Sequence, residues 1–272
     1  MRLRPEPSGT ALAQEWDRLL RTALRRGSLP EELEPTIDVA GLDPRAVDAA
    51  RRGWLRRMVD EHRSATVFSG LLPQLIEAEL PVDVQAVALR MAMDELRHGT
   101  LCGAVARALG VDPVMDIADA SEGPARHPDL TPLPRLLRNV IYASCVSETV
   151  SVALTAAERE EVDAPFVRAV LDQLFGDETL HARFGWICLA EAAPRLTAAE
   201  REAVEVYVPV AIAHYERSID ARIGAPDHEL EPTERRDRAR LGVLDPALAR
   251  EILYDTTRDV IVPRLRDAGL RV

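Results

Sequence analysis

The stretches Asp94–His98 (DELRH) and Asp177–His181 (DETLH) are two copies of one pattern, Asp-Glu-x-x-His. Each copy lies inside a long segment whose apolar residues recur at three- and four-residue intervals, which predicts a helix. Residues three positions apart lie on the same face of a helix. Each helix should therefore direct one carboxylate and one imidazole toward a common point: Glu95 with His98, and Glu178 with His181.

Two further glutamates lie at similar distances upstream of the two motifs. Glu61 shares an apolar helical face with Trp54, and Glu148 shares one with Cys145 and Val152. Two helices that each carry Glu-x-x-His, together with two helices that each carry one Glu, form the ligand set of a carboxylate-bridged dimetal site. The predicted metal ligands are Glu61, Glu95, His98, Glu148, Glu178 and His181.

All six residues are predicted near the middles of their helices, so the site should lie deep in a helical bundle. Four carboxylates that meet in a core repel one another and lose their hydration, unless a counter-charge compensates them. Two metal ions supply that charge. Carboxylate oxygens and imidazoles suit iron or manganese better than metals that prefer thiolates.

The aspartates that precede the two motif glutamates also have a predicted role. A metal-bound histidine usually donates its other ring N–H to a carboxylate or carbonyl, which fixes the orientation of the ring. We expect Asp94 to bind His181 and Asp177 to bind His98 across the bundle. Arg97 is expected to pair with one of the two aspartates.

The spacing of the predicted helices indicates the topology. Four long helices are expected at 44–80, 82–109, 132–161 and 166–193, starting at the capping pairs Asp43-Pro44 and Thr131-Pro132 for the first and third. The first two helices are joined tightly, as are the last two, whereas about 20 residues link the second to the third. Two antiparallel pairs joined by a crossover are the ferritin-like arrangement of a four-helix bundle.

Additional helices are expected on both sides of this bundle. One should span 11–27, a second 197–223 behind a capping box formed by Thr197 and Glu200, and a last one from about 245, kinked or divided at Pro263. We interpret residues 1–272 as a single domain. Its parts are an N-terminal helix and loop (1–42), the four-helix core (43–193) and a C-terminal helical extension (194–272).

Composition supports an all-α, soluble protein. The 272 residues are 47% hydrophobic but only 4% aromatic, and helical periodicity is widespread. A formal net charge of −11 argues against nucleic-acid or membrane partners. The dispersed cysteines 102, 145 and 188 favour a reducing, cytoplasmic location. We see neither a signal peptide nor an uninterrupted apolar run of membrane-spanning length.

These motifs resemble those of the ferritin-like di-iron carboxylate superfamily, over about residues 45–193. The Asp-Glu-x-Arg-His form at 94–98 is similar to the hydroxylase subunits of bacterial multicomponent monooxygenases and to acyl-carrier-protein desaturases. The resemblance implies two iron ions, or a manganese/iron pair, that use O₂ as co-substrate. It implies hydroxylation, desaturation or N-oxygenation of a small or carrier-bound organic substrate, with an electron-donor protein as partner and a homodimer as the expected assembly.

The chain also departs from better-known members of the superfamily. Cys102 lies one turn after His98, where ribonucleotide reductase small subunits carry a radical tyrosine and methane monooxygenase hydroxylases carry a cysteine. Leu174 lies where arylamine N-oxygenases have a seventh histidine ligand. His214 is a candidate substitute ligand, although a hydrogen-bonded histidine without metal is the simpler interpretation. Cys102 is a candidate redox or ligand residue, or a small residue that fills the core.

Three other functions stay open on the sequence alone. The first is a ferroxidase or iron-storage protein, which needs only the bundle. The second is a non-catalytic helical interaction protein in which the metal holds helices together. The third is a rubrerythrin-like peroxidase, ranked last because no Cys-x-x-Cys iron domain is present.

Overall fold

The computed structural model describes residues 2–3, 35–116, 123–224 and 228–272. Within these ranges the chain is helical apart from an antiparallel ladder of two short strands, β1 (Arg2–Leu3) and β2 (Met115–Asp116). The all-α prediction is confirmed for this part of the chain. The helix predicted at 11–27 lies outside the described residues.

The first antiparallel pair consists of α2 (Pro44–Glu77) and α3 (Val82–Ala108). Asp43 caps α2, since its side chain accepts a hydrogen bond of 2.8 Å from the backbone N–H of Arg45. The two helices pack against each other along their length. α3 ends before Gly110, whose φ of +82° lies in the left-handed region that favours glycine.

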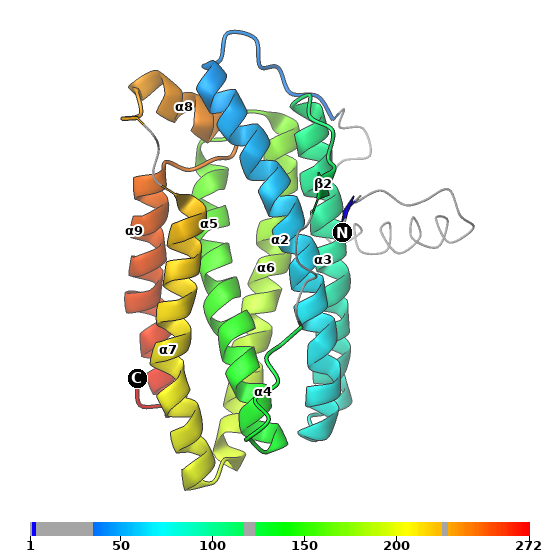
Figure 1. Cartoon of the computed structure of the whole chain (residues 1–272), viewed down its shortest axis with the longest axis vertical. Helices are drawn as coiled ribbons and strands as arrows, with labels where there is room; N and C mark the ends of the chain where they lie inside the picture. Colours follow the sequence, from blue (N-terminus) through cyan, green and yellow to red (C-terminus); the bar gives the residue numbers. More distant parts are fainter. Residues whose placement is uncertain (1, 4–34, 117–122, 225–227) are drawn as a thin grey trace, which may run out of the picture.

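The second antiparallel pair contains a π-helical segment that the sequence analysis did not predict. Its first member runs continuously through α4 (Pro132–Val140), the π-helix η1 (Ile141–Glu148) and α5 (Thr149–Glu160). Its second member is α6 (Pro165–Ala192), which the short 3₁₀ turn η2 (Ala193–Arg195) follows. In Figure 1, α3 ends at the top and α4 begins at the bottom, so the two pairs are joined by a crossover.

The segment Pro132–Glu160 is the one helix of the described residues that is long and apolar enough to cross a membrane. Half of its most apolar window is buried inside the protein. Val140, Ile141 and Val146 in this segment contribute to the hydrophobic core. Its apolar character is therefore that of a helix that packs against neighbouring helices.

The C-terminal part covers one side of the two pairs. It contains α7 (Ala198–Ile223), α8 (Pro232–Arg240), α9 (Pro246–Thr256), the π-helix η3 (Thr257–Ile261) and α10 (Val262–Asp267). α7 and α9 lie along η1 and α5, and α8 contacts α2 (Figure 1). The predicted capping box of Thr197 and Glu200 is present.

Two details of this C-terminal part differ from the sequence prediction. The last helix continues through Pro263, because the π-helical turn of η3 comes directly before it and replaces the expected break. The prolines and many charges between 224 and 244 predict a loop, but residues Pro232–Arg240 form the helix α8. Pro232 occupies its first turn, and Arg238 forms an ion pair of 2.7 Å with Glu234 one turn away inside it.

Candidate metal centre

The two Asp-Glu-x-x-His motifs lie at facing positions on α3 and α6, at mid-height of the bundle. Glu95 and His98 on α3 are 1% and 0% exposed, and Glu178 and His181 on α6 are 3% and 0% exposed. The two imidazole rings face each other with their centroids 5.7 Å apart. The sequence-predicted pairs are thus brought together in the core.

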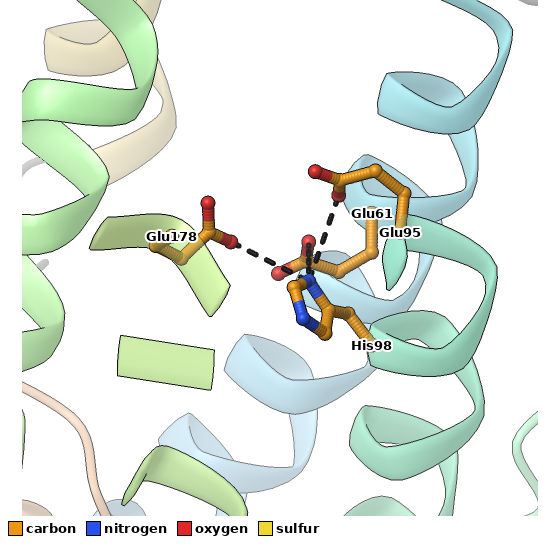
Figure 2. A group of neighbouring side chains, drawn as sticks. All are labelled: Glu61, Glu95, His98 and Glu178. Carbon is orange, nitrogen blue, oxygen red and sulfur yellow. Dashed lines mark ion pairs between the residues drawn. The ribbon is translucent and has the colours of Figure 1, made fainter. Parts of the chain in front are cut away.

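Glu61 on α2 completes a first group with Glu95, His98 and Glu178. One ligand atom from each of these four residues lies within 4.8 Å of the others. The Nδ1 atom of His98 is 3.6 Å from Glu61, 3.7 Å from Glu95 and 3.5 Å from Glu178. Figure 2 shows the three carboxylates arranged around this ring nitrogen.

Glu148, the last residue of η1, completes a second group with Glu95, Glu178 and His181. The Nδ1 atom of His181 is 2.9 Å from Glu95, 3.3 Å from Glu178 and 3.8 Å from Glu148. Glu95 and Glu178 therefore belong to both groups. Glu61 with His98, and Glu148 with His181, belong to one group each.

The donor atoms that face the centre of these groups are not satisfied by hydrogen bonds within the described residues. Glu95 Oε1, His98 Nδ1, Glu178 Oε2 and His181 Nδ1 are buried and make no well-formed hydrogen bond, although His181 Nδ1 lies 2.9 Å from Glu95. Buried polar atoms without partners are costly and uncommon. A cation in each group would satisfy them, so the described residues fit a pair of metal ions.

The other nitrogen of each imidazole is directed at an aspartate of the opposite helix, as predicted. His98 Nε2 lies 3.1 Å from Asp177, and His181 Nε2 lies 3.6 Å from Asp94. Arg97 lies between the two aspartates: it is 3.2 Å from Asp94 and donates a hydrogen bond to Asp177. The sequence analysis expected Arg97 to pair with one aspartate, and it contacts both.

Two further side chains complete this outer layer and were not predicted. Gln173 donates a 2.6 Å hydrogen bond to Asp177, and Arg90 lies 3.2 Å from Asp94. Each of these residues lies four positions before its partner on the same helix. That spacing could have predicted both contacts from the sequence. His98 and Arg97 together hold the pKa of Asp177 below its usual range, although burial acts in the opposite direction. This carboxylate is therefore charged when it receives the imidazole N–H.

Replacing Asp177 by asparagine should weaken metal binding by about 10- to 100-fold, because the imidazole of His98 loses its charged acceptor. Metal titration against a competing chelator measures the effect. Asp172→Asn is the matched control, since Asp172 is an exposed residue of α6 that pairs with Arg159 on the surface. Equal affinities for the Asp177→Asn variant and the unmodified protein would show that Asp177 does not support the centre.

The π-helix η1 positions Glu148 and changes the expected register of its neighbours. Gly185 of α6 packs so closely against η1 that an added Cβ would lie 2.4 Å from Ser144 Cβ. Cys145 was expected on the same face as Glu148, but its charged and polar neighbours are Cys188 and Arg264, outside the metal groups. The wider turn of a π-helix rotates the residues along it away from α-helical register.

The two additional candidates, His214 and Cys102, do not join either group. His214 lies on the outer side of α7, where its Nδ1 is 2.9 Å from the hydroxyl of Tyr142. It is exposed and bonded to Tyr142, which agrees with the simpler interpretation of a hydrogen-bonded histidine without metal. Cys102 is fully buried beside Trp54 and Met58 in the core, and burial raises the pKa of its thiol well above the usual value. It is therefore a neutral thiol that fills space.

Without a cation, the carboxyl and imidazole groups of the centre have raised pKa values. Burial and the neighbouring Glu178 raise the pKa of Glu95 to about 7, and burial and Glu148 raise that of Glu178 to about 7. Burial lowers the pKa values of both imidazoles, but bonds to the surrounding carboxylates outweigh it, so both values lie well above 6.5. The metal-free centre therefore retains protons that metal ions would displace.

Metal-free protein should lose stability as the pH rises from about 5 to 8. Between the ordinary carboxyl pKa of 4.5 and the folded value of about 7, the folded state binds more protons than the unfolded state. The raised imidazole pKa values act in the same direction, since their stabilisation is lost as the pH rises through the folded value. Thermal unfolding with a chelator measures this trend.

Manganese should reverse the pH dependence, because the ligands bind metal in their deprotonated forms. The increase in melting temperature on adding Mn²⁺ should therefore grow from about pH 6 to pH 8. A chelated protein that becomes more stable over this range would contradict the assignment of raised carboxyl pKa values.

A cavity of about 710 Å³ connects the surface with the centre. Its wall includes all four candidate ligand carboxylates, Glu61, Glu95, Glu148 and Glu178, and it lies between α2 and α5 under α7 and α9. A second cavity of about 760 Å³ reaches Glu148 and is lined by Tyr142 of η1 and His214 of α7. Cavities of about 300–1,000 Å³ are typical of sites for organic ligands.

No protein-family model matches this chain, and no curated protein matches it significantly. The chemistry of the site is therefore the basis for any assignment of function.

Proposed function

We propose that this protein is an O₂-dependent dimetal oxidoreductase with a ferritin-like bundle, which oxidises a small organic molecule. The observation that carries the proposal is the cavity of about 710 Å³ whose inner wall is formed by four candidate ligand carboxylates. A metal centre that only holds helices together needs no such access. A centre at the end of a ligand-sized cavity is suited to act on what the cavity holds.

The arrangement of helices supports the ferritin-like part of the proposal. Two antiparallel pairs, α2 with α3 and the α4–α5 segment with α6, are joined by a crossover. One helix of each pair supplies a single Glu, and the other supplies Glu-x-x-His. This distribution of ligands is the one used by di-iron and dimanganese carboxylate proteins with that fold.

The residues of the centre fall into metal ligands and residues that hold the ligands in position. Two iron ions, or one manganese and one iron, would be held by the two groups, with Glu95 and Glu178 shared between them. When bound, the metal pair supplies the electrons that activate O₂. Asp177 accepts the Nε2 proton of His98, and Asp94 lies 3.6 Å from Nε2 of His181, so both Nδ1 atoms face the candidate metal positions. Phe68 packs against the ring of His181 with the ring centroids 5.7 Å apart.

Hydroxylation, desaturation and N-oxygenation are all compatible with this site. A reaction that inserts one oxygen atom needs electrons from outside, so we include an electron-donor protein in the proposal. A ferroxidase or storage protein is the principal alternative. The C-terminal helices that cover the cavity, α7 and α9, favour the oxidation of an enclosed organic molecule over the deposition of iron.

Oxygen uptake by the iron-loaded protein separates these functions. Full-length protein loaded with Fe²⁺ under argon should consume O₂ in one burst, limited by the iron in the centre, and should need a reductant before it consumes more. A storage protein would continue to oxidise added Fe²⁺ and would retain many ions per chain. Loaded protein that is inert toward O₂ would overturn the proposal and favour a structural metal.

A further inference from the structure

We propose that the cavity of about 710 Å³ beside the centre binds a largely apolar molecule that carries one anionic group, with the anion held at the mouth by Arg52, Arg56 and Arg222. This inference rests on the proposed function, since it names the substrate class of the same site. The anionic group is a carboxylate or a phosphate, and the apolar part extends inward toward Glu95 and Glu178.

The three arginines lie at the outer part of the cavity wall. Arg52 and Arg56 are exposed residues one turn apart on α2, and Arg222 is exposed in the last turn of α7. Glu61 lies further along α2 and lines the same cavity. At about 1.5 Å per residue, Arg56 lies about 7 Å and Arg52 about 13 Å from Glu61 along the helix axis. An anion bound at this level leaves room for a chain of several carbon atoms between it and the metals.

These three arginines are exposed, whereas each of the other two arginines of the cavity wall is ion-paired with a glutamate inside the protein. Arg57 donates two hydrogen bonds, of 2.9 and 2.7 Å, to the carboxylate of Glu158, and Arg238 is engaged by Glu234.

Arg56 donates to the backbone carbonyl of Arg222, and Arg222 lies 3.4 Å from Asp60. Arg52 has no partner among the described residues. Since a guanidinium has five N–H donors, all three arginines keep donors free for an anion.

The charge of the cavity also favours an anion. Two divalent metal ions would neutralise the four ligand carboxylates. The wall then retains five arginines against Asp60 and Glu158, and Glu234 outside the wall compensates Arg238, which leaves an excess of two positive charges. This local positive charge is notable in a chain whose formal net charge is −11. It favours the entry of anionic molecules over cationic ones.

Apolar side chains form part of the remaining wall, beside the hydroxyl groups of Ser64, Ser147 and Ser151. The apolar part consists of Leu154 of α5, Ile219 of α7 and Val243 and Leu244 from the turn after α8. An aliphatic or aromatic body would be buried there with a gain of about 25 cal/mol per Å² of apolar surface. The combination of an arginine mouth and a partly apolar interior matches an amphiphilic acid.

Calorimetric titration with four eight-carbon probes tests the inference: octanoate, octyl phosphate, octanol and octylammonium. Full-length protein is measured both metal-free and loaded with Mn²⁺. One or both of the anionic probes should bind at least ~10-fold more tightly than octanol, and octylammonium should bind most weakly. A preference for octanoate or for octyl phosphate identifies which anion the site takes.

Substitutions of the arginines at the cavity mouth test where the anionic group binds. The double variant Arg52→Gln/Arg56→Gln should weaken binding of the preferred anion by at least ~10-fold and leave octanol binding unchanged. Arg183→Gln, which changes an exposed arginine of α6 outside the cavity wall, is the control. Arg52→Gln alone removes no internal contact, so a loss of affinity there does not reflect a damaged fold.

Two results would overturn the inference. One is equal binding of octanoate, octyl phosphate and octanol. The other is anion binding that the double variant does not weaken, which would mean that the probe contacts the metal ions directly. Binding is compared between metal-free and Mn²⁺-loaded protein, so a chain that takes up no metal is distinguished from a metal-loaded chain that does not bind the anion.

Discussion

Replacing Glu178 by glutamine is expected to remove both metal ions, from about two per chain to nearly none. Glu178 belongs to both candidate ligand groups, so the substitution takes a negative charge from each. Glutamine keeps the size of the side chain, which separates the loss of the charge from a packing defect. Elemental analysis of protein purified with iron and manganese supplied measures the effect, and Glu95→Gln should behave in the same way.

The unshared ligands provide the matched comparison for this result. Glu61→Gln and Glu148→Gln each change one group only, so each should retain about one ion per chain. Glu191→Gln, on an exposed position of α6, should retain both. Metal-free Glu178→Gln should be at least as stable as the unmodified protein at about pH 8, because the substitution removes a buried carboxylate whose pKa is raised to about 7. If the Glu178 variant lost only one ion, Glu178 would not be shared.

Replacing Gly185 by alanine should lower the free energy of unfolding by about 1–3 kcal/mol. An added Cβ would lie 2.4 Å from Ser144 Cβ and 2.9 Å from the backbone N of Cys145. Because both neighbours belong to the buried π-helix η1, the contact is relieved only by moving η1 away from α6. Glu148 lies at the end of η1, so metal binding by the second group should weaken as well.

Gly176→Ala on the same helix is the control for this substitution. No atom lies within 4 Å of a Cβ added at Gly176, and alanine stabilises the interior of a helix by up to about 1 kcal/mol relative to glycine. Urea unfolding of the metal-free variants should therefore show opposite shifts of the midpoint. If Gly185→Ala were as stable as Gly176→Ala, the close packing of α6 on η1 would be wrong.

The sequence was sufficient to predict the helices that carry the candidate ligands. These helices depend on local sequence features that packing does not override. The features are the Glu-x-x-His spacing, the capping residue Asp43, and Pro81 and Pro194, which interrupt the chain next to helix ends. The cross-bundle pairing of Asp177 with His98 also followed, because metal-bound imidazoles need an acceptor on their second nitrogen.

Other features depend on tertiary contacts that no local pattern encodes. The π-helix η1 arises where α6 approaches at Gly185, and its sequence alone reads as an ordinary helix. The hydroxyl of Tyr142 engages His214 through the packing of α7, which periodicity cannot reveal. The arginines of the cavity mouth show only a four-residue spacing in the sequence, and the cavity requires α7 and α9 to be in place.

The most direct test of a shared dimetal centre is the magnetic state of the iron-loaded protein after oxidation. Two ferric ions bridged by Glu95 and Glu178 should be spin-coupled, so low-temperature Mössbauer spectra should show a diamagnetic pair and the electron paramagnetic resonance spectrum should be nearly silent. Strong resonance from isolated ferric ions, or iron that is lost on desalting, would contradict the account.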